Sequence, residues 1–247
     1  MLLVRDRARR GAYRHLSERE LLARRRSDTA FVFGSGRSLA SIEEAEWRRL
    51  EAFDTVAFSE FQRQRYVRVD FHLVGEVHDV DEYARLFRDH PCYADTVYVL
   101  QEGLLAARSN ELVARRLLPP TASLFRYRRT SRGVFSPPSR RFADGLVHAF
   151  NSSISATNFA LLMGYPRIVI TGVDLFNREY FWLEPGQARP NEEGDEAAAL
   201  EFRAADAIVD TFGRWRELIE PEGRELLVYS AASRLATVLP VFRWEQP

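Results

Sequence analysis

The turn Gly34-Ser35-Gly36-Arg37-Ser38 has residue types and a spacing that suit the binding of a phosphate group. It follows the apolar run AFVF at 30–33 and precedes a segment whose apolar residues have helical spacing. Glycines let backbone N–H groups approach an anion closely, and a helix N-terminus adds partial positive charge. The alternative is a tight structural connection. The dinucleotide-binding fingerprint needs a third glycine where Leu39 stands, which disfavours NAD binding.

Candidate acid and base groups follow a second apolar run, DFHLV at 70–74. Glu76 and His78 are two residues apart, so they share one side of an extended segment and the carboxylate could orient the imidazole. Histidine titrates near neutral pH, which suits a general base. A surface loop histidine is the alternative. His148 precedes Asn151 by a turn and could face the nucleotide site; a histidine bonded to a carbonyl group at the start of a helix is the alternative.

Short β-rich runs alternate with helical patterns and supply the elements that must position these residues. The apolar runs lack polar alternation, which is typical of strands buried on both faces in a parallel sheet. We expect a doubly wound, mostly parallel, Rossmann-like α/β sheet with helices on both faces and a lid excursion. Strands are predicted at 30–33, 55–58, 70–74, 96–100, 167–172 and 225–230, and helices within 38–53, 80–87, 110–118, 152–165 and 196–218.

The predicted organisation is a basic N-terminal arm at 1–29 followed by a single nucleotide-binding domain at 30–247. Within the domain, the arginine-rich and proline-containing stretch at 126–141 is expected to form an exposed basic loop. The polar stretch at 177–195 has the length of a lid over a site. In the helix within 38–53, Ser41 is expected to cap the N-terminus with Glu44.

Composition excludes several classes of protein. The chain has 247 residues, 46% hydrophobic and 28% charged, which is ample for a globular core. All 35 basic residues are arginines and they balance 35 acidic ones, so no overall positive charge recruits nucleic acid. The single cysteine and the lack of a long apolar run favour a cytoplasmic protein, with peripheral contact to the inner face of the membrane through the arginine-rich segments.

The blocks GSGRSL at 34–39, FDTVAFSEF at 53–61, residues 151–176 and LLVYSAASRL at 226–235 resemble bacterial sialyltransferases of glycosyltransferase family 42. They also resemble the related MptE-like family of 6-hydroxymethylpterin pyrophosphokinases. The resemblance covers most of residues 30–240. It implies a CMP-sugar donor and an inverting, metal-independent transfer to the hydroxyl group of a glycan.

The resemblance also implies roles for individual residues. Phe176 and Tyr180 lie near two family tyrosines that hold the phosphate, but Phe176 lacks the hydroxyl group. Ser59 stands where the family usually has an asparagine. The implied nucleotide-binding residues are Gly34, Ser35, Gly36 and Ser38 at the phosphate turn, Ser59, Asn151 and Ser152 beside the donor, Gly172 and Asp174 under the base and ribose, and Phe176 and Tyr180.

One departure from the family concerns the general base, a histidine in the segment after the Gly-x-Asp turn. No histidine occurs between Asn177 and Leu200. A desolvated carboxylate can act as a base instead, so the lid acids Glu184, Glu192, Glu193 and Asp195 are substitutes. The predicted catalytic residues are His78, Glu76 and Asp195.

The predicted function is therefore transfer of a sugar from a nucleotide-sugar, with CMP-sugar favoured, to a bacterial surface glycan or glycolipid. No cofactor, metal or nucleic-acid partner is expected. One alternative is an MptE-like pyrophosphokinase that needs Mg-ATP. Another is a catalytically silent nucleotide-binding module.

Overall fold

A computed structural model describes the chain over most of its length. Side chains are described except at 107 and 195–203. The described residues are 13–75, 77, 79–102, 107–130, 135–149, 151–176, 179–185, 187 and 195–244.

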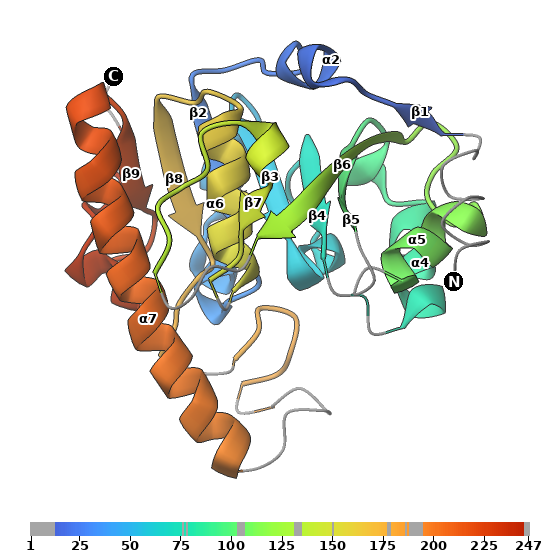
Figure 1. Cartoon of the computed structure of the whole chain (residues 1–247). Coiled ribbons are helices and arrows are strands. Elements are labelled where there is room, and N and C mark those ends of the chain that lie inside the picture. Colours follow the sequence, from blue (N-terminus) through green and yellow to red (C-terminus); the bar gives the residue numbers. More distant parts are fainter. Residues whose placement is uncertain are drawn as a thin grey trace.

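The centre of the molecule is a parallel β-sheet (Figure 1). Its strand order is β1-β6-β5-β4-β3-β2-β8-β9, and β7 pairs with β6 beside this path. The paired strands run in the same direction. The strands are β1 Arg14–His15, β2 Thr29–Phe33, β3 Asp54–Phe58, β4 Phe71–Val74, β5 Val97–Glu102, β6 Ser123–Thr130, β7 Leu146–Val147, β8 Arg167–Thr171 and β9 Glu225–Val228.

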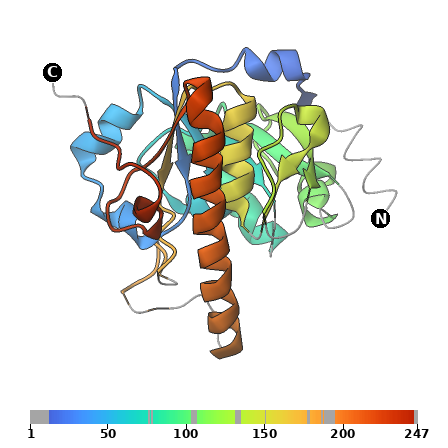
Figure 2. The same ribbon diagram turned by 60° about the vertical axis from the view of Figure 1, so that its left-hand side comes forward.

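Helices cover both faces of this sheet, which confirms the predicted doubly wound α/β fold. Helices α6 (Ser152–Leu162) and α7 (Asp195–Ile219) lie on one face, and Figure 2 shows α7 extending beyond the sheet at its N-terminal end. Helices α3 (Glu44–Leu50), α4 (Val80–Arg88) and α5 (Ala107–Ala114) lie on the other face. Every residue of β2, β3 and β4 is buried, which explains why their sequences do not alternate.

The buried faces of the helices follow their sequence spacing. In α4, the buried residues Val80, Tyr83, Ala84 and Phe87 recur at helical spacing and face the sheet. Helix α6 is buried from Ser153 to Leu161, because it lies between the sheet and the apolar side chains of α7. Such a helix cannot be amphipathic, and its sequence is apolar or small on all sides.

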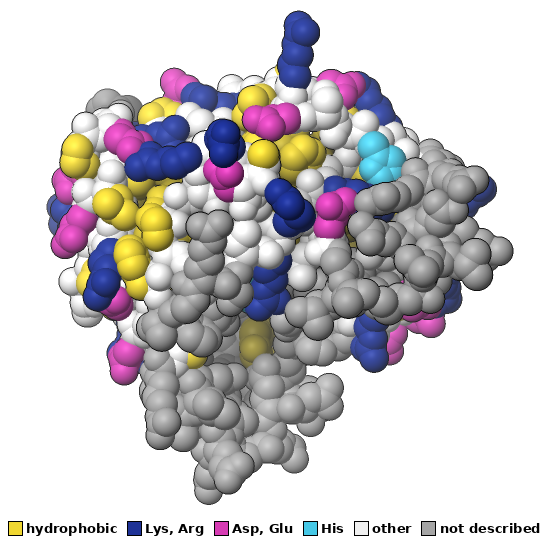
Figure 3. All heavy atoms as spheres, in the orientation of Figure 1, with side chains coloured by type: hydrophobic (Ala, Val, Ile, Leu, Met, Phe, Trp, Pro, Cys, Tyr) yellow, Lys and Arg dark blue, Asp and Glu magenta, His cyan; other side chains and the backbone are white. Residues whose placement is uncertain are grey.

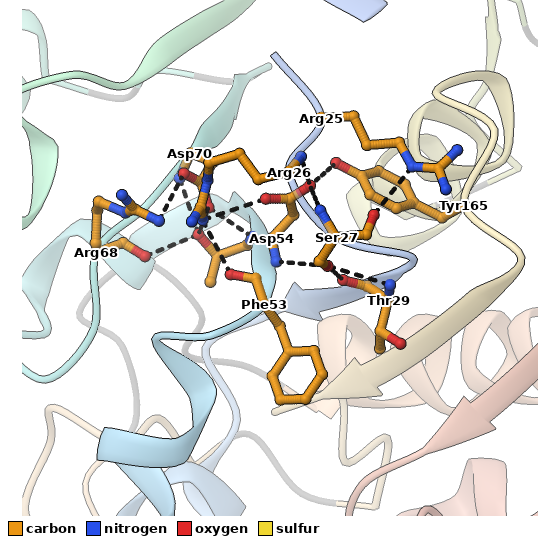
Figure 4. Close-up of polar contacts among 10 residues, drawn as sticks. Arg25, Arg26, Ser27, Thr29, Phe53, Asp54, Arg68, Asp70 and Tyr165 are labelled. Atoms are coloured by element: carbon orange, nitrogen blue, oxygen red, sulfur yellow. Dashed lines mark hydrogen bonds and ion pairs between the residues drawn. The ribbon is translucent and has the colours of Figure 1, made fainter. Parts of the chain in front are cut away.

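The amino ends of the central strands are joined by a network of polar groups (Figure 4). The carboxylate of Asp54, which is fully buried, accepts hydrogen bonds from the Arg26 N–H at 2.7 Å and the Tyr165 hydroxyl at 2.9 Å. The Arg26 guanidinium forms ion pairs with Asp54 at 3.2 Å and Asp70 at 2.9 Å. Asp70 also accepts from the Thr55 N–H at 3.0 Å. These contacts connect the segments that begin β2, β3, β4 and β8.

The prediction of an N-terminal arm at 1–29 is wrong for the residues from 13 onward. Strand β1 pairs with the start of β6, and Tyr13 donates its hydroxyl hydrogen to the Leu118 carbonyl oxygen at 2.8 Å. Leu21 of helix α2 (Glu18–Leu22) is fully buried. This segment is part of the domain, because its few apolar residues are spaced to reach the core.

The prediction of a basic loop at 126–141 is also wrong in part. Residues 126–130 belong to β6, and they are arginine-rich because the outer part of this strand reaches the surface. On the face shown in Figure 3, arginine and acidic side chains are interspersed rather than gathered in one basic patch. Described arginines of this stretch bond to groups of the chain: Arg126 to Asn110, Arg128 to the Ala143 carbonyl, Arg140 to Glu222 and Arg141 to Asp144.

The predicted cap at Ser41 is wrong. Residues Arg37–Ser41 form the short 3-10 helix η1, and Glu43 with Glu46 forms the capping box of α3. The Ser41 hydroxyl donates to the Ser38 carbonyl oxygen at 2.7 Å. The helix therefore begins two residues later than predicted, with Glu43 and Glu46 as its capping box.

Candidate active site at the strand-order reversal

The sheet reverses its order between β2 and β8. The chain passes from β2 through β3, β4 and β5 to β6, and then returns through α6 to place β8 on the other side of β2. Ligands of open α/β sheets bind at the carboxyl ends of the strands beside such a reversal. The turns at 34–38 and 172–176 follow these two strands, so the reversal brings them together.

The two turns are joined by hydrogen bonds. The N–H group of Gly34 donates to the Thr171 carbonyl oxygen, and that of Gly36 to the Gly172 carbonyl oxygen, each at 2.8 Å. The Asp174 carboxylate accepts from the Ser38 N–H at 2.9 Å and from the Ser38 hydroxyl. Three N–H groups that suit a phosphate are therefore used within the chain, and Asp174 takes the place of an anion at the start of η1.

The glycines of the first turn are required by this close contact. A Cβ atom on Gly34 would lie 2.4 Å from the Gly172 carbonyl oxygen. A Cβ atom on Gly36 would lie 2.5 Å from Oδ2 of Asp174. The sequence pattern correctly indicated close backbone approach, and the structure shows that the approaching group belongs to the chain itself.

The described part of the predicted lid lies over the first turn. Tyr180 forms an antiparallel bridge with Gly36, and the Phe181 N–H donates to the Ser35 carbonyl oxygen at 3.1 Å. The Arg37 guanidinium donates to the Leu183 carbonyl oxygen at 2.7 Å. Residues 179–185 are thus a strap held onto the turn, while most of 186–194 lies outside the described residues.

Backbone strain is concentrated at the carboxyl ends of β3 and β8. Ser59 has φ of 54° and Leu175 has φ of 63°, in the left-handed region that L-residues rarely adopt. Among the described non-glycine residues, only Arg116 after α5 shares this feature. Strained backbone persists where surrounding structure enforces it, and it is found often at ligand sites.

A narrow pocket lies farther along the same edge of the sheet, where β4, β5 and β6 end beside the N-terminus of α6. It has room for about one water molecule. Most of its residues were not predicted from the sequence, because no strand was expected at 123–130 and residues 126–141 were expected to form a loop. The pocket is lined by Leu73, Gly75, Gln101, Tyr127, Arg129, His148, Ser152 and Ser155.

His148 in this pocket is held in one orientation. Its Nδ1 lies 3.0 Å from the Ser155 hydroxyl oxygen, and Ser155 donates its own hydrogen to the Val147 carbonyl oxygen at 3.0 Å. The Ser155 oxygen therefore accepts from Nδ1–H, and Nε2 of the neutral ring keeps its lone pair. Burial, aided by the positive charge of Arg129, lowers the pKa of His148 to about 4.

The other predicted nucleotide-binding residues are spread along the same edge of the sheet. Asn151 caps α6 through a hydrogen bond from the Ser153 N–H at 2.7 Å, and Ser152 lines the narrow pocket. The buried Ser35 hydroxyl accepts from the Glu60 N–H at 3.1 Å. Ser59 and Phe176 are exposed. The Phe176 ring has no polar hydrogen, so it cannot donate a hydrogen bond to a phosphate group.

The side chains of the predicted catalytic residues are not among those that the structure describes, so their roles stay predictions. Glu76 and His78 lie outside the described residues, as do Glu192 and Glu193. Asp195 is the first residue of α7, and its side chain is not among those described. His72 of β4 is fully buried next to the hydroxyl groups of Tyr93 and Tyr83.

The described residues contain no group of three or more histidine, cysteine, aspartate or glutamate side chains arranged to hold a metal ion. In the same part of the chain, no helix combines the length and the apolar character that crossing a bilayer requires.

Comparison with known proteins found no family model, no curated protein and no solved structure that matches this chain. The likeness to family 42 and MptE-like enzymes therefore stays a prediction made from the sequence.

Proposed function

We propose that this protein is a glycosyltransferase of the sialyltransferase-like class, which transfers a sugar from a nucleotide-sugar to a bacterial surface glycan. The observation that carries the proposal is the reversal of strand order between β2 and β8, with strained backbone at Ser59 and Leu175 beside it. This is the place where such sheets bind nucleotides. The choice of a sugar transferase rests on the sequence resemblance.

The arrangement of donors suggests how a nucleotide-sugar would lie. The N–H groups of Gly34, Gly36 and Ser38 are used, so the phosphate charge needs other partners. Arg129 and the N-terminus of α6 at Ser152 provide positive charge beside the narrow pocket. Asp174 is then suited to the neutral hydroxyl groups of a ribose, because a carboxylate repels phosphate.

His148 is the general base of this proposal. Its neutral imidazole is oriented by Ser155, and Nε2 can accept the proton of an acceptor hydroxyl group as the glycosidic bond forms. The low pKa of His148, about 4, keeps it unprotonated at neutral pH.

The first test is a thermal-shift panel of CMP, CDP, UDP, GDP and ATP, each with and without magnesium. At about 100 times the dissociation constant, binding adds about 2.7 kcal/mol, which is several degrees of Tm. We expect stabilisation by CMP or CDP without magnesium. Arg129→Gln should remove this stabilisation, whereas Arg88→Gln on the exposed surface of α4 should not. Stabilisation by ATP with magnesium alone would favour the pyrophosphokinase and overturn the proposal.

The second test concerns the base. His148→Gln should lower kcat with an activated CMP-sugar by about 10² to 10⁴, while the CMP-induced shift in Tm remains. Wild-type kcat should stay flat from pH 8 to about 5, because His148 remains neutral in that range. Full activity in His148→Gln would exclude it as the base.

A further inference from the structure

A groove of about 500 Å³ lies next to the reversal of strand order, on the face of the sheet that α3 covers. Its volume lies within the range of small-molecule sites. None of the residues predicted from the sequence to bind nucleotide or to act in catalysis lines this groove. The groove is formed by Leu39, Ala40, Ile42, Glu44, Trp47, Arg48, Arg65 and Tyr66.

A column of four stacked aromatic rings ends in this groove. Phe61 stacks on Phe33 at 4.7 Å between ring centroids, Phe33 on Trp47 at 5.8 Å, and Trp47 on Tyr66 at 5.1 Å. The interplanar angles lie between 16° and 28°. Phe61 and Phe33 are fully buried, but Tyr66 is 56% exposed. The core thus supports Tyr66 as a rigid platform whose ring is open to solvent.

Charged groups flank this platform. Arg65 donates to the Gln64 carbonyl oxygen at 3.3 Å, and no carboxylate of the described residues forms an ion pair with it. Arg48 lies 3.5 Å from Glu44, but both side chains are largely exposed. Such a surface ion pair contributes little stability, so Arg48 and Glu44 can exchange it for contacts with a ligand at little loss of stability.

The groove borders the proposed nucleotide site through Leu39. This residue lines the groove, and it also lies directly under Gly172, where an added Cβ atom would be 2.7 Å from Leu39 Cγ. Leu39 follows Ser38, whose N–H and hydroxyl groups donate to Asp174. A ligand in the groove is therefore separated from the 172–174 turn by a single layer of side chains.

We propose that this groove binds an acidic saccharide at a site separate from the reaction centre, with one sugar ring on Tyr66. The negative face of an aromatic ring attracts the weakly positive C–H groups of a pyranose. Arg48 and Arg65 suit its carboxylate, while Glu44 can accept from its hydroxyl groups.

The test uses the full chain and saturation-transfer NMR with trigalacturonate, the neutral trisaccharide maltotriose, and CMP. We expect trigalacturonate to bind and maltotriose to bind more weakly. Tyr66→Ala and Arg65→Gln should each weaken trigalacturonate binding about tenfold, which corresponds to one lost contact of ordinary strength. Tyr66→Phe keeps the ring and should retain the signal, and Arg88→Gln is the matched control for charge. Unchanged Tm shows that the variants are folded.

Three outcomes would overturn the inference: no trigalacturonate signal in the folded wild type, equal binding by Tyr66→Ala, or loss of CMP rather than saccharide binding in that variant. Failure of the transferase proposal has a different signature. Trigalacturonate would then bind in a Tyr66-dependent manner, while no nucleotide would bind and no sugar would be transferred.

Discussion

At Gly36 any side chain would meet the carboxylate of Asp174, so this residue is fixed by a contact within the protein. A glycine turn that follows a strand and precedes a helix is usually interpreted as a phosphate-binding site. Here the lack of a side chain lets the turns at 34–38 and 172–176 approach each other and share hydrogen bonds. The residue type was informative, but its partner was not readable from the local sequence.

This contact predicts the effect of Gly36→Ala. The new Cβ atom would lie 2.5 Å from Asp174 Oδ2 and 2.9 Å from the Gly172 carbonyl oxygen, so both turns must move. We expect a loss of about 1–3 kcal/mol in the free energy of unfolding, measured by urea denaturation. Gly75→Ala is the control, since its nearest neighbours lie 3.9 Å away. Equal stability of the two variants would contradict the geometry of the turns.

At the scale of elements, the carboxyl ends and the amino ends of the strands have different roles. The carboxyl edge carries strained backbone and the candidate site. The amino edge carries the network around Asp54, whose buried charge is met by Arg26 and by hydrogen bonds. Burial and the adjacent Asp54 carboxylate raise the pKa of Tyr165, so its hydroxyl group remains a donor.

The amino-edge network predicts graded losses of stability. Tyr165→Phe removes one hydrogen bond to Asp54 and should cost about 1 kcal/mol. Arg26→Gln leaves two carboxylates without their shared cation and should cost about 3 kcal/mol. Both are measured by urea denaturation, and CMP affinity of the folded variants should not change. A larger loss for Tyr165→Phe than for Arg26→Gln would contradict the central place of Arg26.

Much of the element pattern was predictable, because apolar runs of five residues demand burial on both faces. The strands at 30–33, 55–58 and 167–172 match β2, β3 and β8 closely. Strand β6 was not predicted, because a stretch rich in arginine is typical of an exposed loop. It nevertheless lies between β1 and β5, and Arg126 bonds to Asn110. The narrow pocket was missed for the same reason, because Tyr127 and Arg129 come from that strand.

At the scale of the whole molecule, three buried histidines link stability to pH. Burial lowers the pKa of His72 to about 3 and those of His90 and His148 to about 4. In the unfolded chain these rings take up protons below about pH 6.5, while in the folded chain they stay neutral. Acid therefore favours the unfolded state, and stability is lost as the pH falls from about 6.5 toward 4.

The expected loss between pH 7 and pH 5 is roughly 2 kcal/mol for each of these histidines. Urea denaturation across this range should show it, together with proton uptake on unfolding. His90→Asn should reduce the pH dependence by about one proton, whatever its effect on stability at pH 7. A flat stability between pH 7 and 5 would show that these rings are protonated in the folded state.

Short segments pair with β6 and β9 near the two sides of the sheet. Strand β1 pairs with Ser123 and Leu124 at one end of β6, and β7 pairs with Arg129 and Thr130 at the other end. Beside β9, Val228 bonds to Pro240 and Phe242. An open strand is a template on which another polypeptide can add and aggregate. Proteolytic removal of residues 13–16 or 240–244 would expose such templates, so these segments protect the protein from self-association as much as they stabilise it.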